Sequence, residues 1–210
     1  MKRRFVLLIL IIAFCATLLS ERKEKYSVVD EDGRDVLLTI FYPRLSKYSN
    51  KINLKSVDYD NTFFFKDKYK LNIYKFISGR LNDENRADIV FGVYNEAPHH
   101  RVMARRMFAY NIIDGKLAAK FRCSRFITPM IDFTLYDFDG EGFDEVVTIE
   151  RYQNKYSLNI YKQYDLKIER ISTLALEKPA DKLLLENGVY IIEDNIKRQV
   201  DFKNKEVILK

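Results

Sequence analysis

One nine-residue stretch constrains the fold of this chain more than any other. Residues 137 to 145 read Asp-Phe-Asp-Gly-Glu-Gly-Phe-Asp-Glu, and the β-prone run Val-Val-Thr-Ile follows them. Acidic side chains at alternate positions, separated by glycines that accept positive φ, are typical of a tight turn lined with oxygen atoms. The pattern therefore predicts an acidic turn that leads into a β-strand.

The rest of the chain after residue 20 has the period of strands. Residues 71–76 alternate with a period of two, and no later stretch shows an amphipathic helix of three turns or more. Asp114-Gly115 is a dipeptide that favours a two-residue hairpin. Residues 23–26 are expected to be a charged linker and residues 43–55 to be irregular. We expect an all-β domain with strands at 26–30, 35–42, 62–66, 69–77, 88–94, 103–113, 116–121, 130–136, 146–152, 157–164, 167–176, 182–186, 189–193, 197–202 and 206–209.

The first twenty residues predict export. Three basic residues at positions 2–4 precede an apolar run at 5–19 that only Thr17 interrupts, which is the outline of a secretion signal. A spanning helix needs roughly 20 apolar residues, so this run is short for a permanent anchor. We divide the chain into a signal peptide or membrane anchor at 1–22 and a repeat domain at 23–210.

Three fates of this segment stay open. One fate is cleavage after Cys15, in which Ala13 and Cys15 are the small residues of the cleavage site. Another is an uncut segment, which leaves residues 5–19 in the membrane. Lipidation of Cys15 is the third, because Ile12-Ala13 resembles the residues before a lipidated cysteine, although Phe14 stands where a small residue belongs. All three predict an exported protein that is periplasmic, on the cell surface or anchored in the membrane.

The distribution of charge limits the classes of partner, and the cysteine content limits the disulfides. The net charge is +6, but residues 1–20 hold three basic residues and no acidic ones, which leaves 33 Lys and Arg against 30 Asp and Glu. The two signs are interspersed without a basic stripe of interleaved aromatics, so the sequence argues against nucleic acid as a partner. Cys123 is the one cysteine after residue 20, and the domain therefore has no internal disulfide.

An internal repeat relates the acidic turn to an earlier segment. Residues 80–90 align with residues 137–147 at an offset of 57, with Asn82 on Asp139 and the two apolar runs together. Arg80 replaces the first carboxylate in this earlier copy, so a guanidinium is expected in the place of a cation. Residues 30–35 read as a plain hairpin. Residues 24–210 hold about three such units, fewer than the 4 to 8 blades of a closed propeller.

The second copy resembles the FG-GAP or VCBS-type repeat of integrin-like β-propellers, whose core is an acidic turn of the form D-x-D-G-D-G-x-x-D before an apolar strand. Phe91-Gly92, after the apolar run of the first copy, resembles the FG of that family. The segment Arg105-Arg106-Met107-Phe108, with Lys120-Phe121 and Ser124-Arg125 before Pro129, also looks like uncharacterised exported bacterial proteins with such repeats. The resemblance covers about residues 70–165 and implies antiparallel four-stranded blades, arranged as a partial or small β-propeller after the N-terminal segment.

The acidic turn is also the candidate metal site. Ca²⁺ takes about 6 to 8 hard oxygen ligands, which alternating carboxylates, a backbone carbonyl and water can supply. The alternative is a turn without metal, in which Asp137 and Asp139 accept backbone N–H groups. The expected ligands of one Ca²⁺ are Asp137, Asp139, Glu141, Phe143 through its carbonyl, and Glu145.

The motifs present favour a non-catalytic protein. No nucleophile elbow, Ser/His/Asp set or phosphate-binding glycine loop occurs, so we expect an exported or membrane-tethered protein with a protein-interaction or scaffolding role. The alternative is a carbohydrate-active or other hydrolase that uses a carboxylate pair.

Several partners follow from this interpretation. We expect a protein or glycan on the envelope side, the membrane through residues 5–19 if they are uncleaved, and a second copy through open sheet edges. His99-His100 lacks the spacing of a zinc site and is expected in an exposed loop. Arg101, Arg105 and Arg106 are expected on a solvated strand face. The alternative is that these three arginines bind an anion.

Overall fold

The computed structural model describes residues 21–82, 86–98, 100–165 and 167–210, and residues 1–20 of the expected signal or anchor at 1–22 lie outside them. Within these residues the chain forms strands β1 to β16 and one 3-10 turn, η1 (Asp67–Tyr69), which confirms the all-β prediction. None of the helical segments in this part of the chain has the length and apolar character needed to cross a membrane.

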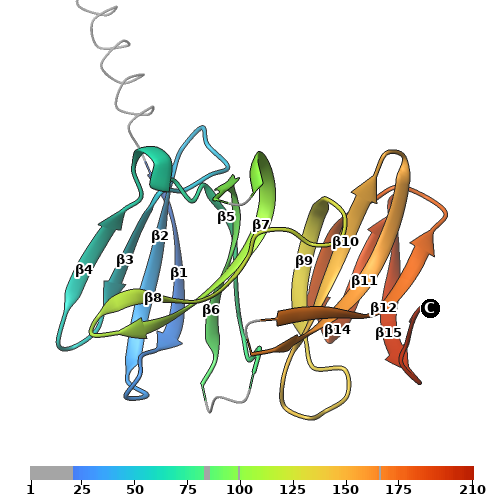
Figure 1. Cartoon of the computed structure of the whole chain (residues 1–210). Helices are drawn as coiled ribbons and strands as arrows, with labels where there is room; N and C mark the ends of the chain where they lie inside the picture. Colours follow the sequence, from blue (N-terminus) through green and yellow to red (C-terminus); the bar gives the residue numbers. More distant parts are fainter. Residues whose placement is uncertain (1–20, 83–85, 99, 166) are drawn as a thin grey trace, which may run out of the picture.

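The strands form four antiparallel, four-stranded sheets in chain order, as Figure 1 shows. Sheet A contains β1 (Glu21–Val29), β2 (Asp35–Pro43), β3 (Lys51–Lys55) and β4 (Asp60–Phe64). Sheet B contains β5 (Ile73–Gly79), β6 (Asp88–Ala97), β7 (His100–Ile113) and β8 (Lys116–Cys123). Sheet C contains β9 (Met130–Tyr136), β10 (Glu145–Tyr152), β11 (Lys155–Tyr164) and β12 (Lys167–Leu176). Sheet D contains β13 (Ala180–Glu186), β14 (Gly188–Glu193), β15 (Ile196–Lys203) and β16 (Glu206–Leu209).

The 57-residue spacing holds in the two central sheets and fails outside them. Strands β5 and β9 begin at Ile73 and Met130, and β6 and β10 begin at Asp88 and Glu145, so each pair is 57 positions apart. The estimate of about three units was wrong, because sheets A and D are shorter repeats. Their first two strands are joined by residues 30–34 and by residue 187 alone, where sheets B and C use eight residues.

Two segments expected to lack structure are strands. Residues 23–26 belong to β1, which pairs with β2 along its whole length. Residues 51–55 form β3, in which Ile52 and Leu54 are fully buried between exposed or half-buried polar residues. Residues 23–25 are all charged and residues 51 and 55 are lysines, and these charges concealed the period of two. The hairpin at Asp114-Gly115 is confirmed, because both residues have positive φ, +50° and +65°.

Hydrophobic cores join the sheets face to face in a row. One core lies between sheets A and B, a second between B and C, and a third between C and D. Gly92 of β6 marks one close approach, since a Cβ there would lie 2.9 Å from the Phe133 ring of β9. No hydrophobic core among the described residues joins sheet D back to sheet A. The blades therefore form an open, partial ring.

The first strand of each sheet lies on the inner side of this ring. A cavity of about 340 Å³ is lined by Tyr26 of β1, Lys75 of β5, Thr134 of β9 and Leu183 of β13, among others. The Lys75 ammonium lies 2.7 Å from an oxygen of Asp132 in β9, whose second oxygen accepts the Leu183 N–H at 2.8 Å. This polar contact ties sheets B, C and D together.

The up-and-down order of the strands gives the molecule two different ends. At the connector end lie the described residues of the links between second and third strands and of the links between sheets: 44–50, 65–72, 98, 124–129, 153–154, 177–179 and 194–195. At the turn end lie the described residues of the remaining links: 30–34, 56–59, 80–82, 86–87, 114–115, 137–144, 165, 187 and 204–205. The predicted acidic turn therefore joins β9 to β10 at the turn end.

Candidate functional site

The acidic turn is closed by its own backbone. The two oxygens of Asp137 accept the Gly140 N–H at 2.7 Å and the Gly142 N–H at 2.9 Å. Asp139 accepts the Glu141 N–H at 3.0 Å, and both glycines have positive φ, +73° and +88°. These are the hydrogen bonds of the metal-free alternative.

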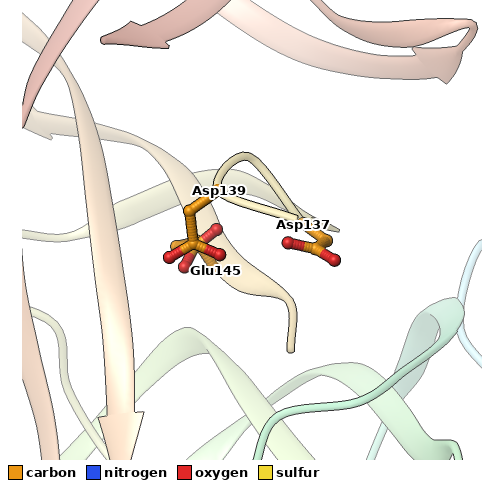
Figure 2. Close-up of side chains that lie close together, drawn as sticks. All are labelled: Asp137, Asp139 and Glu145. Carbon is orange, nitrogen blue, oxygen red and sulfur yellow. The ribbon is translucent and has the colours of Figure 1, made fainter. Parts of the chain in front are cut away.

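A lysine from a neighbouring strand lies among the remaining carboxylate oxygens. The Lys162 ammonium, on β11, is 3.0 Å from Asp139, 2.7 Å from Glu141 and 3.7 Å from Glu145. Figure 2 shows the carboxylates of Asp139 and Glu145 beside each other and that of Asp137 across the turn. Oxygens of Asp137, Asp139 and Glu145 lie within 4.8 Å of one another.

The charges of this cluster shift one another's protonation. The hydrogen bond to Glu141, with a second to Asp139, raises the pKa of Lys162. Burial acts to raise the pKa of Asp139, but the Glu141 N–H and Lys162 together hold it below its ordinary value. Burial raises the pKa of Glu145, and the Phe138 N–H opposes that rise in part. Lys162 is therefore held as a cation by the turn.

The last carboxylate of the turn has the same structural role in both copies of the repeat. Glu145 is fully buried and accepts the Phe138 N–H at 3.0 Å. Asp88, 57 positions earlier, is also fully buried and accepts the Leu81 N–H at 3.1 Å. Each also meets a lysine ammonium, since Lys120 lies 2.7 Å from Asp88. In both copies this carboxylate closes the loop through a backbone N–H and lies beside a lysine ammonium.

The two copies of the loop also contact each other. Asp144 of the acidic turn accepts the Arg80 N–H at 2.6 Å and donates its own N–H to the Arg80 carbonyl at 2.6 Å. A Cβ on Gly142 would lie 3.6 Å from the Arg80 guanidinium. The guanidinium thus lies beside the acidic turn. Glu84, which the alignment places on Glu141, lies outside the described residues.

The donor set of the turn fits Ca²⁺ in kind, because it consists of hard carboxylate oxygens. Lys162 is the cation that lies among these carboxylates, and a metal ion would have to displace it from Asp139, Glu141 and Glu145. A calcium role for these oxygens, and for the Phe143 carbonyl, stays a prediction.

A second site lies at the connector end, where the sequence contains no recognisable motif. It is a groove of about 1070 Å³ between sheets B, C and D. The start of β7, the 124–129 connector, the β10–β11 turn and the β14–β15 turn line it. Its walls mix apolar side chains that are more than half exposed with arginines: Val102, Ile127, Tyr152, Arg105, Arg125 and Arg151.

Arg106 is a buried cation in the wall of this groove. Its side chain is 1% exposed, which corrects the expectation of a solvated position. The guanidinium donates to the carbonyls of Asn95 at 3.0 Å, His100 at 3.0 Å and Val102 at 2.7 Å, and it lies 3.2 Å from the His100 ring. Burial lowers the pKa of Arg106. Within the described residues no carboxylate forms an ion pair with it, so the groove keeps this positive charge.

A buried carboxylate fixes the opposite wall. Glu150 of β10 is fully buried and accepts the Thr128 N–H at 2.7 Å and the Thr128 hydroxyl at 2.8 Å. Its second oxygen accepts the hydroxyls of Thr148 at 2.8 Å and Tyr161 at 2.6 Å. The two donors of Thr128 therefore hold the 124–129 connector against sheet C, and the two donors within the sheet keep the carboxylate in place, so this wall has a fixed shape.

Sequence reasoning placed the acidic turn correctly and missed the groove. Arg105 and Arg106 were singled out, but nothing local showed that they face a connector 20 residues later or a turn from sheet D. Of the histidine pair, His100 lines the groove and His99 lies outside the described residues. A usable signal was Glu150, an acid directly after the β-prone run 146–149 and within the same predicted strand, because a buried carboxylate requires several hydrogen-bond donors.

No protein-family model matches this chain, and no curated protein matches it either. The resemblance to FG-GAP and VCBS-type repeats therefore rests on the acidic turn and on the blade-like sheets.

Proposed function

We propose that this chain is a non-catalytic, exported or membrane-tethered bacterial protein with FG-GAP or VCBS-like repeats, and that it has a protein-interaction or scaffolding role. The groove at the connector end is its binding site. The observation that supports this most is the convergence of three sheets on one groove, since binding residues are commonly carried by loops that a rigid scaffold positions.

The groove suits a partner segment that is apolar and acidic. It contains four arginines, Arg105, Arg106, Arg125 and Arg151, and two acids. One of the acids, Asp194, is paired with Lys178 at 3.3 Å. Aromatic, Met and Arg side chains are also the types that dominate binding energy at protein interfaces.

Site-specific photocrosslinking tests this role. A photoreactive residue at Tyr152, in the groove, is expected to give a discrete crosslinked protein in cells that make the chain naturally, because a bound partner would lie against this side chain. A photoreactive residue at Val57, which is 93% exposed at the turn end, serves as the control and is expected to give none.

Charge reversal makes the test specific. Arg125→Glu and Arg151→Glu are each expected to weaken the crosslink from position 152, since an acidic partner then meets a like charge. Equal crosslinks from positions 152 and 57, or a crosslink that both reversals leave unchanged, would count against the groove as the binding site.

A hydrolase with a carboxylate pair remains the alternative class, and Asp181 and Asp194 are the carboxylates that the groove offers it. In a glycosidase such groups stand about 5 to 10 Å apart. We expect Asp181→Asn to leave partner crosslinking intact. Release of reducing sugar from envelope glycans by the native chain, lost in Asp181→Asn, would favour the hydrolase.

A further inference from the structure

The two ends of the molecule carry opposite charge. In the described loop residues, the connector end has seven Lys and Arg against three Asp and Glu, whereas the turn end has ten Asp and Glu against four Lys and Arg. The chain as a whole is nearly balanced after residue 20, so this separation is produced by the strand order. It gives the fold a basic end and an acidic end.

The basic end also presents apolar side chains to solvent. Six large apolar residues that lie in its links or within four positions of them are between 42% and 82% exposed: Leu45, Val102, Met103, Ile127, Tyr152 and Ile196. Side chains of this kind, set among basic residues, are what an interfacial membrane contact uses.

The chain also enters the domain at this end. Glu21, the first residue of β1, pairs with Pro43 and lies 3.1 Å from Lys51, so it flanks the 44–50 link. That link reaches the groove, because Tyr48 stacks on Tyr94 with ring centroids 5.5 Å apart and Tyr94 lines the groove. The apolar segment 5–19 ends two residues before Glu21. Two residues span at most about 7 Å, so an inserted segment would bring the basic end to the bilayer.

We propose that the connector end docks on a bilayer of anionic phospholipid. The basic links supply the attraction, the six exposed apolar residues enter the headgroup region, and the acidic turn end faces away. The proposal rests on the proposed function in one respect, the membrane tether. It extends that function: four of the six apolar residues, Val102, Met103, Ile127 and Tyr152, also line the groove, so a partner would reach the groove along the lipid surface.

Tryptophan quenching in the full chain tests this orientation. The chain contains no tryptophan, so one introduced residue reports one position. Ile127→Trp is placed at the basic end and Val57→Trp at the acidic end, and each chain is reconstituted into phosphatidylcholine vesicles that contain phosphatidylglycerol and brominated acyl chains. We expect quenching at position 127 and none at position 57. Equal quenching at the two positions would overturn the proposal.

Charge reversal separates docking from tethering. Arg44→Glu and Lys47→Glu, introduced into the Ile127→Trp chain, leave the segment 5–19 unchanged and alter no further groove residue. The ratio of docked to undocked molecules is expected to fall about fivefold for each basic residue removed, so quenching at position 127 declines. Vesicles of phosphatidylcholine alone should lower the quenching at position 127 of the Ile127→Trp chain in the same way. Quenching that neither change lowers would reject an anionic-lipid contact, and circular dichroism of each variant verifies the fold.

The two proposals fail separately. Absence of quenching at position 127 with an intact crosslink from position 152 rejects lipid docking and leaves the groove as a protein site. Quenching at position 127 without any crosslink from position 152 supports lipid docking and rejects the groove as a protein-binding site. A photocrosslink from Leu45 to a protein, in place of quenching, would assign this end to a protein partner and overturn the lipid proposal.

Discussion

At the scale of single residues, Lys162 decides the chemistry of the acidic turn. Its ammonium contacts three of the four carboxylates predicted to bind calcium. A divalent ion and an ammonium cannot share these oxygens at close range, because like charges repel strongly where water is partly excluded. The lysine is therefore a competitor for any metal.

This competition predicts a specific effect of Lys162→Met. Calcium at millimolar concentration is expected to raise the melting temperature of the variant more than that of the native chain, because the variant leaves Asp139, Glu141 and Glu145 without their cation. Differential scanning fluorimetry with Ca²⁺ and with chelator measures both shifts. Asp139→Ala is the control and should abolish them. If calcium changes the melting temperature of neither chain, the turn does not bind calcium.

A second residue-scale prediction concerns Cys123, which is 4% exposed in sheet B. Burial raises the pKa of its thiol from 9.0 to about 12. Because the folded state binds this proton more tightly than the unfolded state, its contribution to stability is complete below about pH 9 and is lost as the pH rises toward 12. With Cys15 replaced by Ser, folded protein at pH 8 should react slowly with a thiol reagent.

The pH dependence supplies the matched comparison. Between pH 9 and pH 11 the free energy of unfolding should fall more steeply for the Cys123 chain than for Cys123→Ala, as measured by urea denaturation. Parallel pH profiles, or rapid reaction of the folded thiol, would show that the thiol is accessible.

At the scale of elements, the inner strands are joined by polar contacts where the cores end. Asp132 of β9 reaches Lys75 of β5 and the N–H of Leu183 in β13, so one side chain connects three sheets. Lys75 and Asp132 occupy equivalent positions, 57 residues apart, in neighbouring blades. The repeat therefore carries opposite charges at one position, which places the two blades in register.

Removing this contact should destabilise the domain as a whole. Asp132→Ala is expected to lower the free energy of unfolding by about 2 to 4 kcal/mol, because it leaves Lys75 and a buried N–H without their acceptor. Urea denaturation of residues 21–210 measures the loss. Glu186→Ala, which breaks an exposed pair with Lys197, is the control and should cost about 0 to 1 kcal/mol. Equal costs would show that the inner contact has no special role.

At the scale of the whole molecule, the open ring leaves two sheet faces uncovered. The side of sheet A that faces away from sheet B carries Leu37, which is 39% exposed, and Phe64, which is 58% exposed, in strands β2 and β4. Among the described residues no core covers this side or the outer side of sheet D. Open sheets with apolar side chains favour association.

We predict that residues 21–210 self-associate weakly through these faces. Sedimentation equilibrium should give an average mass that rises with protein concentration, because association follows mass action. Phe64→Lys, on the edge strand of sheet A, should lower this rise, and Val57→Lys at the turn end should not. If the average mass is that of the monomer at every concentration, the open faces do not mediate self-association.

The sequence by itself determined the strand composition of the fold and the position of its most regular turn. Strands 130–136, 167–176 and 206–209 were predicted with their bounds, because local alternation and turn residues are sufficient to define a strand. The acidic turn was predicted from Asp137 and two glycines within six positions, and the hydrogen bonds that close it are among those expected of its metal-free alternative.

Only the tertiary structure decided what these elements do together. Lys162 reaches the acidic turn from β11, Arg106 lines a groove with residues of sheet D, and the basic and acidic links separate to opposite ends. None of these contacts is local in sequence, because each depends on the order in which strands turn back and on how sheets stack. The charge of a loop can be read from its residues, whereas the end of the molecule that it occupies is a property of the fold.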